Sequence, residues 1–363
     1  MRARTRRRLV PTATGLLLAA IVCLAPACAS RPGGPAAGAG GNPPGSGAAE
    51  DRERGRERPA LPAQITVRVA APSGGRRVMT LPLEVYVLGA VRAEVLPSTL
   101  RAEAASPALD VQAIVSRTYA VANLGRHAAD GFDLCDTTHC QVYRGAAAGE
   151  GPRDAAARAV DATRGRVLTF QGRPIQALFH AECGGHTASA ASVWGGTEAP
   201  YLESVTDWFC ARRQDAGWTF GADAAAIARA LNGDARTRAG DRLQRIDIAA
   251  RDASGRALAV TLVGTRTLSG RAEGFRAVMT QAFGARSIRS TWFDVARDAS
   301  RLRFTGVGYG HGVGLCQTGT ALRAAARQSP AEILAHYYPG TQLRSGRTAT
   351  VRPDLAARLL GRP

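Results

Sequence analysis

The segment at residues 81–120 reads LPLEVYVLGAVRAEVLPSTLRAEAASPALDVQAIVSRTYA, and the rest of the fold is organised around it. Apolar residues recur at helical spacing in its first part, which predicts a buried helix that runs up to residues 92–97. Pro97 disfavours helical geometry in the residue before it, so we expect the helix to end there. The sequence therefore places one carboxylate in the last turn of an apolar helix.

Glu94 occupies an unfavourable position for a negative charge, because the C-terminus of a helix is the negative end of its dipole. Partial burial would raise the pKa of its carboxyl group further. A carboxyl group that stays protonated near neutral pH is suited to general acid catalysis. The alternative is a carboxylate that faces water or pairs with Arg92 or Arg101.

A second helix is expected at residues 109–127, and the Ala-Ser-Pro sequence at residues 105–107 is expected to interrupt helical structure before it. This helix carries Gln112 and Arg117 among small residues. A buried arginine needs an acidic partner, and Glu94 is one candidate.

The next segment, HAADGFDLCDTTHCQVYRG, brings two histidines and two cysteines close together in the sequence. They are His127, Cys135, His139 and Cys140. Closely spaced Cys and His residues are typical of a zinc site, although this spacing matches no standard zinc finger. The alternatives are a disulfide between Cys135 and Cys140, which an oxidising compartment would allow, and unpaired loop residues.

Strands and helices alternate over the rest of the chain. Strands are expected at residues 65–69, 77–81, 166–170, 175–179, 246–249, 257–263, 292–295 and 302–306, with the first three pairs as hairpins. Helices are expected at residues 155–163, 223–231, 273–283, 321–326 and 330–338. The pattern predicts an α+β fold with mostly antiparallel strands, as one domain at residues 64–345.

Two glycine-rich segments contain further candidate site residues. The first, FHAECGGHT, includes His180, Gly184 and Gly185, and adjacent glycines after a strand let the backbone approach a ligand closely. The second, at residues 306–319, includes His311 and Gln317 and has too many glycines for a core strand or helix. It lacks the Gly-Lys-Ser/Thr of a phosphate-binding loop, so we expect a tight loop around a different ligand.

Cys183, in the first of these segments, has two open interpretations. It could form a disulfide with Cys210, or it could bind a metal ion together with His180 and His186.

The N-terminus has the features of an export signal. Five arginines precede a short apolar run at residues 15–24, and Ala-Pro-Ala before Cys28 fits a cleavage site. The same segment resembles a lipoprotein signal, in which a lipid on Cys28 would be the membrane contact. Residues 29–63, rich in Gly, Pro, Ala and Ser, are expected to form a disordered linker, and residues 346–363 a basic tail.

The net charge of the chain is strongly positive. Cleavage before Cys28 would remove five arginines and no acidic residue, which lowers the formal charge from +18 to +13. A basic exported protein is attracted to anionic surfaces such as cell-wall polymers and lipid head groups. We therefore expect a location in the periplasm or cell envelope and no nucleic-acid partner.

Six motifs in the order LPLEVYVLGAVRAEVLP, VQAIVSRTYA, CDTTHCQVYRG, FHAECGGHT, GYGHGVGLCQTG and EILAHYYPG resemble the stage II sporulation protein D family, also called SpoIID/LytB. The resemblance covers roughly residues 65–343 and implies a SpoIID-like domain with a central groove. Members of that family act on bacterial peptidoglycan. Some look like lytic transglycosylases that cut glycan strands, and others are described as enhancers of a cell-wall amidase.

The resemblance also implies roles for individual residues. The catalytic glutamate of the family falls on Glu94. The implied substrate-binding residues are Gln112, Arg117, His180, Gly184, Gly185, His311 and Gln317. Some relatives bind zinc through the loop that here contains His127, Cys135, His139 and Cys140, which implies a structural Zn²⁺.

The function that follows is an exported lytic transglycosylase. Such an enzyme needs one carboxyl group, which protonates the glycosidic oxygen and then accepts a proton from the C6 hydroxyl of the sugar. The product is a 1,6-anhydro sugar. The alternatives are a non-catalytic wall-binding enhancer of an amidase and a zinc hydrolase that uses the His and Cys residues.

Overall fold

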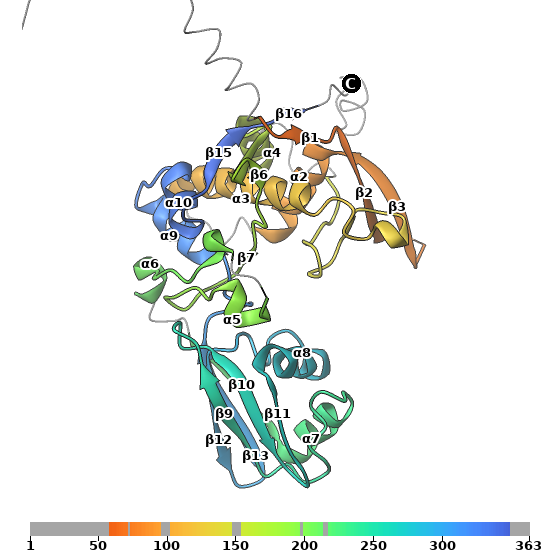
Figure 1. Cartoon of the computed structure of the whole chain (residues 1–363), viewed down its shortest axis with the longest axis vertical. Coiled ribbons are helices and arrows are strands. Elements are labelled where there is room, and N and C mark those ends of the chain that lie inside the picture. The colour runs from red at the N-terminus through yellow and green to blue at the C-terminus, as the bar shows by residue number, and fades with distance from the viewer. Residues whose placement is uncertain are drawn as a thin grey trace, which may run out of the picture. The chain divides into compact units, whose positions relative to one another are not determined.

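The structure is a computed structural model that describes residues 58–71, 73–95, 102–146, 154–196, 199–212 and 217–348 (Figure 1). These ranges contain helices and several small, mostly antiparallel sheets, so the expected α+β fold is confirmed. No helix in the described ranges is long and apolar enough to cross a membrane. The expected leader and Cys28 lie outside the described residues.

The helices of the described ranges are α2 (Leu83–Glu94), α3 (Ala102–Ala122), α4 (Ala155–Ala162), α5 (Ala190–Trp194), α6 (Trp208–Ala211), α7 (Ala224–Asn232), α8 (Ala272–Phe283), α9 (Gln317–Ala325) and α10 (Pro330–Tyr337), with 3-10 turns η2 (Ala128–Asp130) and η4 (Pro200–Leu202). The longest helix of the described ranges is α3, with 21 residues.

The strands form small separate sheets. One three-stranded sheet has the order β3 (Arg76–Pro82), β2 (Gln64–Ala70), β4 (Leu134–Cys135). Another has the order β15 (Gln342–Ser345), β5 (Arg166–Phe170), β6 (Arg173–Pro174). Two parallel pairs are β7 (Phe179–His180) with β14 (Leu315–Cys316), and β1 (Ala60–Leu61) with β16 (Arg347–Thr348). Two further sheets are antiparallel throughout. The first has the order β11 (Thr267–Arg271), β10 (Ala257–Val263), β9 (Arg245–Arg251), and the second has the order β12 (Phe293–Asp298), β13 (Arg301–Val307), β8 (Gly217–Asp223).

The first hydrophobic core is built around α2 and α3. Every residue of α2 from Val85 to Val91 is buried, because apolar and small residues surround the helix on all sides. The ring of Tyr143 packs against Gly89 of this helix, at a place where a Cβ atom would clash, and it stacks on Tyr86 with ring centroids 5.3 Å apart. The loop that contains Tyr143 is therefore held against α2.

A second hydrophobic core lies within residues 218–304, where α7 and α8 pack with the two antiparallel sheets. Phe275, Phe293 and Phe304 form a mutual aromatic cluster at its centre, with ring centroids 5.7–6.0 Å apart. This segment is inserted between α6 and β14, so it separates in sequence two parts of the first core.

The limits of α3 differ from the expected ones. The helix begins at Ala102 and contains Pro107, so the expectation that residues 105–107 interrupt it is wrong. A proline removes a single backbone donor, and here that loss falls near the start of a long helix whose later turns pack in the core. The helix ends at Ala122 because the Asn123 side chain bonds the Tyr119 carbonyl oxygen at 2.8 Å and Gly125 turns left-handed.

Two further expectations need correction. The strand expected at residues 175–179 does not form as one strand. The partner of β5 is β6, just before it at Arg173–Pro174, and only Phe179 at its end belongs to a strand, β7, which pairs with β14. The linker was expected to reach Ala63 and the tail to begin at residue 346, but β1 and β16 pair with each other. Leu61 is 3% exposed and packs against Gly346, so burial extends the folded part beyond both expected boundaries.

Candidate functional site

Glu94 lies in the last turn of α2, as the sequence predicts. It is the last residue of the helix, because Val95 is already extended. One carboxylate oxygen, Oε1, accepts a hydrogen bond of 2.6 Å from the backbone N–H of Val142. Burial raises the pKa of Glu94, and the Val142 hydrogen bond lowers it in part. The direction of this shift is the one that general acid catalysis requires.

Glu94 forms no ion pair with any residue in the described ranges. Arg92, which was a candidate partner, forms its ion pair with Asp154 and donates a hydrogen bond of 2.9 Å to the carbonyl oxygen of Ala146. The other candidate, Arg101, lies outside the described residues. No described cation therefore offsets the effect of burial on the Glu94 carboxyl group.

Gln112 and Gln317 lie beside the end of α2. The Gln317 side-chain nitrogen donates to the backbone oxygen of Glu94 at 3.3 Å and to Oε1 of Gln112 at 3.2 Å. Gln112 in turn donates to the Ser116 hydroxyl at 3.1 Å. The structure thus brings three of the predicted site residues together, from α2, α3 and the first residue of α9.

Arg117 is not part of this group. Its guanidinium is fully buried and forms a bidentate ion pair with Glu84. Nε donates to Oε1 at 2.9 Å and Nη2 donates to Oε2 at 2.6 Å. The partner is therefore Glu84 and not Glu94, which corrects the pairing considered from the sequence. Because the remaining donors face the carbonyl oxygens of Val160 and Arg166, Arg117 joins α2, α3 and α4 instead of facing a ligand.

His180 and His311 form a second group with Trp194. The His311 ring centroid lies 5.7 Å from that of His180 and 5.1 Å from that of Trp194, whose side chain is 48% exposed. Burial lowers the pKa of both histidines, that of His311 to about 3, so both rings are neutral at physiological pH. Nε2 of His180 is buried without a hydrogen-bond partner in the described part of the chain.

Gly184 and Gly185 turn left-handed, as the tight segment predicts, with φ of +76° and +114°. A Cβ at Gly184 would meet Val307, and a Cβ at Gly185 would meet Ala211. These close approaches are to the protein itself, so both glycines serve the packing of this segment.

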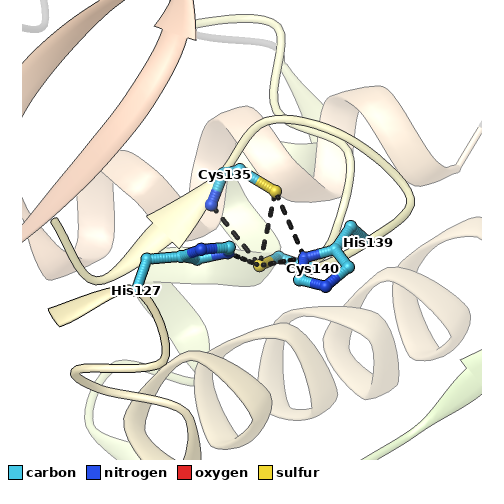
Figure 2. Close-up of side chains that lie close together, drawn as sticks. All are labelled: His127, Cys135, His139 and Cys140. Atoms are coloured by element: carbon cyan, nitrogen blue, oxygen red, sulfur yellow. Dashed lines mark hydrogen bonds between the residues drawn. The ribbon is translucent and has the colours of Figure 1, made fainter. Parts of the chain in front are cut away.

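The four predicted metal ligands lie together in the loop that includes β4 (Figure 2). Tetrahedral zinc geometry separates two sulfur ligands by about 3.8 Å, and a sulfur from a nitrogen ligand by about 3.5 Å. The two cysteine sulfurs are 3.5 Å apart, Cys140 Sγ lies 3.4 Å from His127 Nε2, and His139 Nδ1 lies 3.8 Å from both sulfurs. The residues present therefore fit a tetrahedral zinc ion.

Two other features of this cluster agree with a metal site. Cys135 and Cys140 are free thiols. Nδ1 of His127, the nitrogen that faces away from Cys140, lies 3.4 Å from a carboxylate oxygen of Asp130. Histidine ligands of zinc commonly have a carboxylate on their second nitrogen, which orients the ring.

The same loop supports Glu94. Two residues after Cys140, Val142 supplies the N–H that binds the Glu94 carboxylate. Between them, the buried Gln141 side chain donates to the backbone oxygen of Ser116 in α3 at 3.1 Å. The candidate metal cluster and the backbone N–H that binds the candidate acid are thus two residues apart along one loop.

A cavity of about 630 Å³ lies between the β2–β3 hairpin and this loop, lined among others by Val85, Val142 and Tyr143. Glu94 is not among its lining residues. The central groove expected around Glu94 and the glycine-rich segment stays a prediction.

Sequence reasoning missed two residues that shape the site, Glu84 and Val142. Glu84 could have been found, because a buried arginine in α3 requires an acid and α2 offers two. Val142 acts through its backbone N–H, so its side chain carries no signal of its role.

Comparison with known proteins agrees with these motifs. The profile of the stage II sporulation protein family SpoIID matches residues 73–170. An uncharacterized protein of Brachyspira hyodysenteriae is 32% identical over 269 residues, which are 73% of this chain and 67% of that protein. The chain belongs to the stage II sporulation protein D family.

Two named relatives come from Bacillus subtilis. Its stage II sporulation protein D is 28% identical over 296 residues, 78% of this chain and 80% of that protein. Its amidase enhancer is 26% identical over 296 residues, 69% of this chain but only 40% of that protein.

Proposed function

We propose that this protein is an exported, peptidoglycan-acting lytic transglycosylase in which Glu94 is the single acid and base. The observation that carries the proposal is the carboxyl group of Glu94, whose pKa burial raises and whose Oε1 is fixed by the Val142 N–H. Membership of the stage II sporulation protein D family supports the substrate class.

The proposed reaction uses one proton in two steps. Protonated Glu94 donates to the glycosidic oxygen while an oxocarbenium-like centre develops at the anomeric carbon, and the bond between them breaks. The carboxylate then accepts the proton of the C6 hydroxyl, whose oxygen bonds to the anomeric carbon. Because Val142 occupies Oε1, we assign Oε2 to proton transfer.

Other residues are proposed to hold the glycan and the acid. Gln317 contacts both Glu94 and Gln112, so these two amides are assigned to positioning at the end of α2. The exposed Trp194 ring, which contacts His311, offers an aromatic face of the kind on which sugars stack. His180 is assigned to positioning His311 through their ring contact, and Gly184 and Gly185 to the packing of their segment. Arg117 is assigned to the scaffold.

We also propose that His127, Cys135, His139 and Cys140 hold a structural Zn²⁺. The ion would fix the loop whose Val142 N–H binds Glu94. A four-ligand site leaves no open coordination position, so such an ion braces the loop instead of activating water. Removal of this ion by a chelator is expected to lower activity and thermal stability together, whereas a zinc hydrolase would lose turnover and stay folded.

A second candidate function is a non-catalytic enhancer of a cell-wall amidase. It is favoured by the relative named amidase enhancer, of which this chain spans less than half. In that case the chain would bind peptidoglycan and the amidase, and Glu94 would have no chemical role.

The test is digestion of purified glycan strands, with and without stem peptides, followed by mass analysis. The wild-type protein is expected to release 1,6-anhydro products, and Glu94→Gln to reduce the rate by about 10²–10⁴-fold. Glu203→Gln, at an exposed glutamate, is the matched control and is expected to keep full activity. Release of anhydro products by Glu94→Gln at the wild-type rate would refute the role of Glu94.

The same proteins separate the two candidate functions. An enhancer would create no new glycan ends by itself, and the wild-type and Glu94→Gln proteins would stimulate a cell-wall amidase equally.

A further inference from the structure

A second cluster of metal-ligating side chains lies in the protein interior, outside the site described above. Cys183, Asp207, Cys210 and Cys316 are all buried, and their sulfur and carboxylate oxygen atoms lie within 4.8 Å of one another. They come from three segments: the loop after β7, the start of α6 and the end of β14. All three cysteines are free thiols, so the disulfide considered between Cys183 and Cys210 is not formed.

The spacing of these atoms fits a tetrahedral ion. With zinc–sulfur and zinc–oxygen distances of about 2.3 and 2.0 Å, tetrahedral angles separate two sulfurs by about 3.8 Å and a sulfur from an oxygen by about 3.5 Å. Cys316 Sγ lies 3.9 Å from Cys210 Sγ. Cys183 Sγ lies 3.5 Å from Oδ2 of Asp207.

Backbone N–H groups point at the sulfur atoms. Cys316 Sγ accepts hydrogen bonds from the N–H groups of Cys183 and Gly319, each at 3.2 Å, and Cys183 Sγ accepts one from Gly185 at 3.3 Å. Cys316 is also the N-cap of α9, where the helix dipole favours a negative charge. Such donors stabilise thiolates, which are the form of cysteine that binds metal.

Two buried arginines flank the cluster. Arg256 is 1% exposed and donates to the backbone oxygens of Cys183 and His186 at 2.6 and 2.7 Å, yet no carboxylate in the described ranges forms an ion pair with it. Arg323 is 6% exposed and lies 3.3 Å from Asp207. The acidic groups near the Arg256 guanidinium are two thiols of the cluster and two carboxyl groups outside it: Cys183, Cys316, Asp252 and Glu273. Buried cations require nearby anions, so both arginines favour negative charge on the cluster.

The charges balance with a divalent ion. Three thiolates and one carboxylate carry four negative charges, of which the ion neutralises two. Arg256 and Arg323 neutralise the other two. A disulfide between any two of the cysteines would leave the third thiol unused.

We propose that Cys183, Cys210, Cys316 and Asp207 form a second structural site for a divalent, thiol-binding cation, with zinc as the expected ion. Tyr337, whose hydroxyl donates to Oδ2 of Asp207 at 2.6 Å, orients the carboxylate ligand. Because Gln317 directly follows Cys316, the ion also fixes the residue that contacts Glu94. This site does not depend on whether the protein cleaves glycan.

The test is metal content together with the oxidation state of the cysteines. The full chain is exported with its own leader, purified without chelator or added metal, and analysed by mass spectrometry for zinc. A second sample is unfolded and alkylated without reductant. We expect about two zinc ions per chain if both clusters bind metal, and alkylation of Cys183, Cys210 and Cys316.

Two double variants assign the ions. Cys135→Ser with Cys140→Ser should retain about one zinc ion, whether or not that loop binds metal in the wild-type protein. Cys183→Ser with Cys316→Ser should lose that ion. If the second variant does not fold, the zinc content of the first variant is decisive. Absence of zinc from the first variant would overturn the proposal. A disulfide within the cluster in the wild-type protein, or unchanged zinc in the second variant, would also overturn it.

Discussion

The two ends of α2 carry glutamates in opposite circumstances. Glu84, in the first turn, meets the buried guanidinium of Arg117 through both carboxylate oxygens and accepts a further hydrogen bond from the Gly165 N–H at 3.3 Å. Glu94, at the last residue, meets a single N–H and no described cation. The helix dipole favours the charge of the first and opposes that of the second.

This difference assigns Glu84 to the stability of the fold and makes Glu94 the candidate for acid catalysis. A carboxylate that is paired with a buried cation holds the fold together through that ion pair. A partly buried carboxyl group without such a partner holds its proton to higher pH. The same residue type on one helix therefore stabilises the fold at one end and is suited to proton transfer at the other.

The largest expected effect on stability comes from Glu84→Gln. The substitution keeps the shape of the side chain but leaves the fully buried charge of Arg117 without an anion. Removing one partner of a buried ion pair costs about 3–5 kcal/mol of unfolding free energy. Urea unfolding followed by circular dichroism measures this loss, and a loss below about 1 kcal/mol would mean that the pair is not effectively buried.

A smaller effect is expected at the amide pair beside Glu94. A double-mutant cycle on Gln112→Ala and Gln317→Ala should give a coupling of about 0.5–1.5 kcal/mol, the range for one uncharged hydrogen bond. Both single variants should also slow glycan cleavage, because Gln317 contacts the backbone of Glu94.

The control for this cycle combines Gln317→Ala with Thr261→Ala. Thr261 bonds Ser269 between β10 and β11 and shares no partner with Gln317. These two changes should add to within about 0.5 kcal/mol. Equal coupling in both cycles would show that the amide contact is not specific.

The sequence predicted the features that local physics controls. The helical periodicity of α2 and the effect of Pro97 act within a few residues, so the end of the helix near Glu94 was predictable. The grouping of the four candidate ligands in the His127–Cys140 loop was also predictable, because they lie close in the sequence.

Features that depend on distant segments were not predictable. The choice of Glu84 over Glu94 by Arg117 is decided by how α2 packs on α3 and α4. The pairing of β7 with β14 joins segments on either side of the second core, and it brings Cys183 and Cys316 together. No local pattern in either segment indicates which distant segment it pairs with. Neither the strand pair nor the second cluster could therefore be inferred from the sequence.

The smallest expected effect is also the one that contrasts most directly with Glu84. Because burial raises the pKa of Glu94 in the folded protein, its proton is held more tightly there than in the unfolded chain. The stability that Glu94 contributes is therefore fully present below its unfolded pKa of about 4.3, and it is lost as the pH rises through the folded value.

Glu94→Gln does not titrate, so it should melt at a higher temperature than the wild type at neutral pH, and the difference should disappear toward pH 4. Thermal melts across this range measure the effect. A Glu94→Gln protein that is less stable than the wild type at neutral pH would show that the ionised carboxylate is held favourably, which would remove the physical basis for its role as an acid.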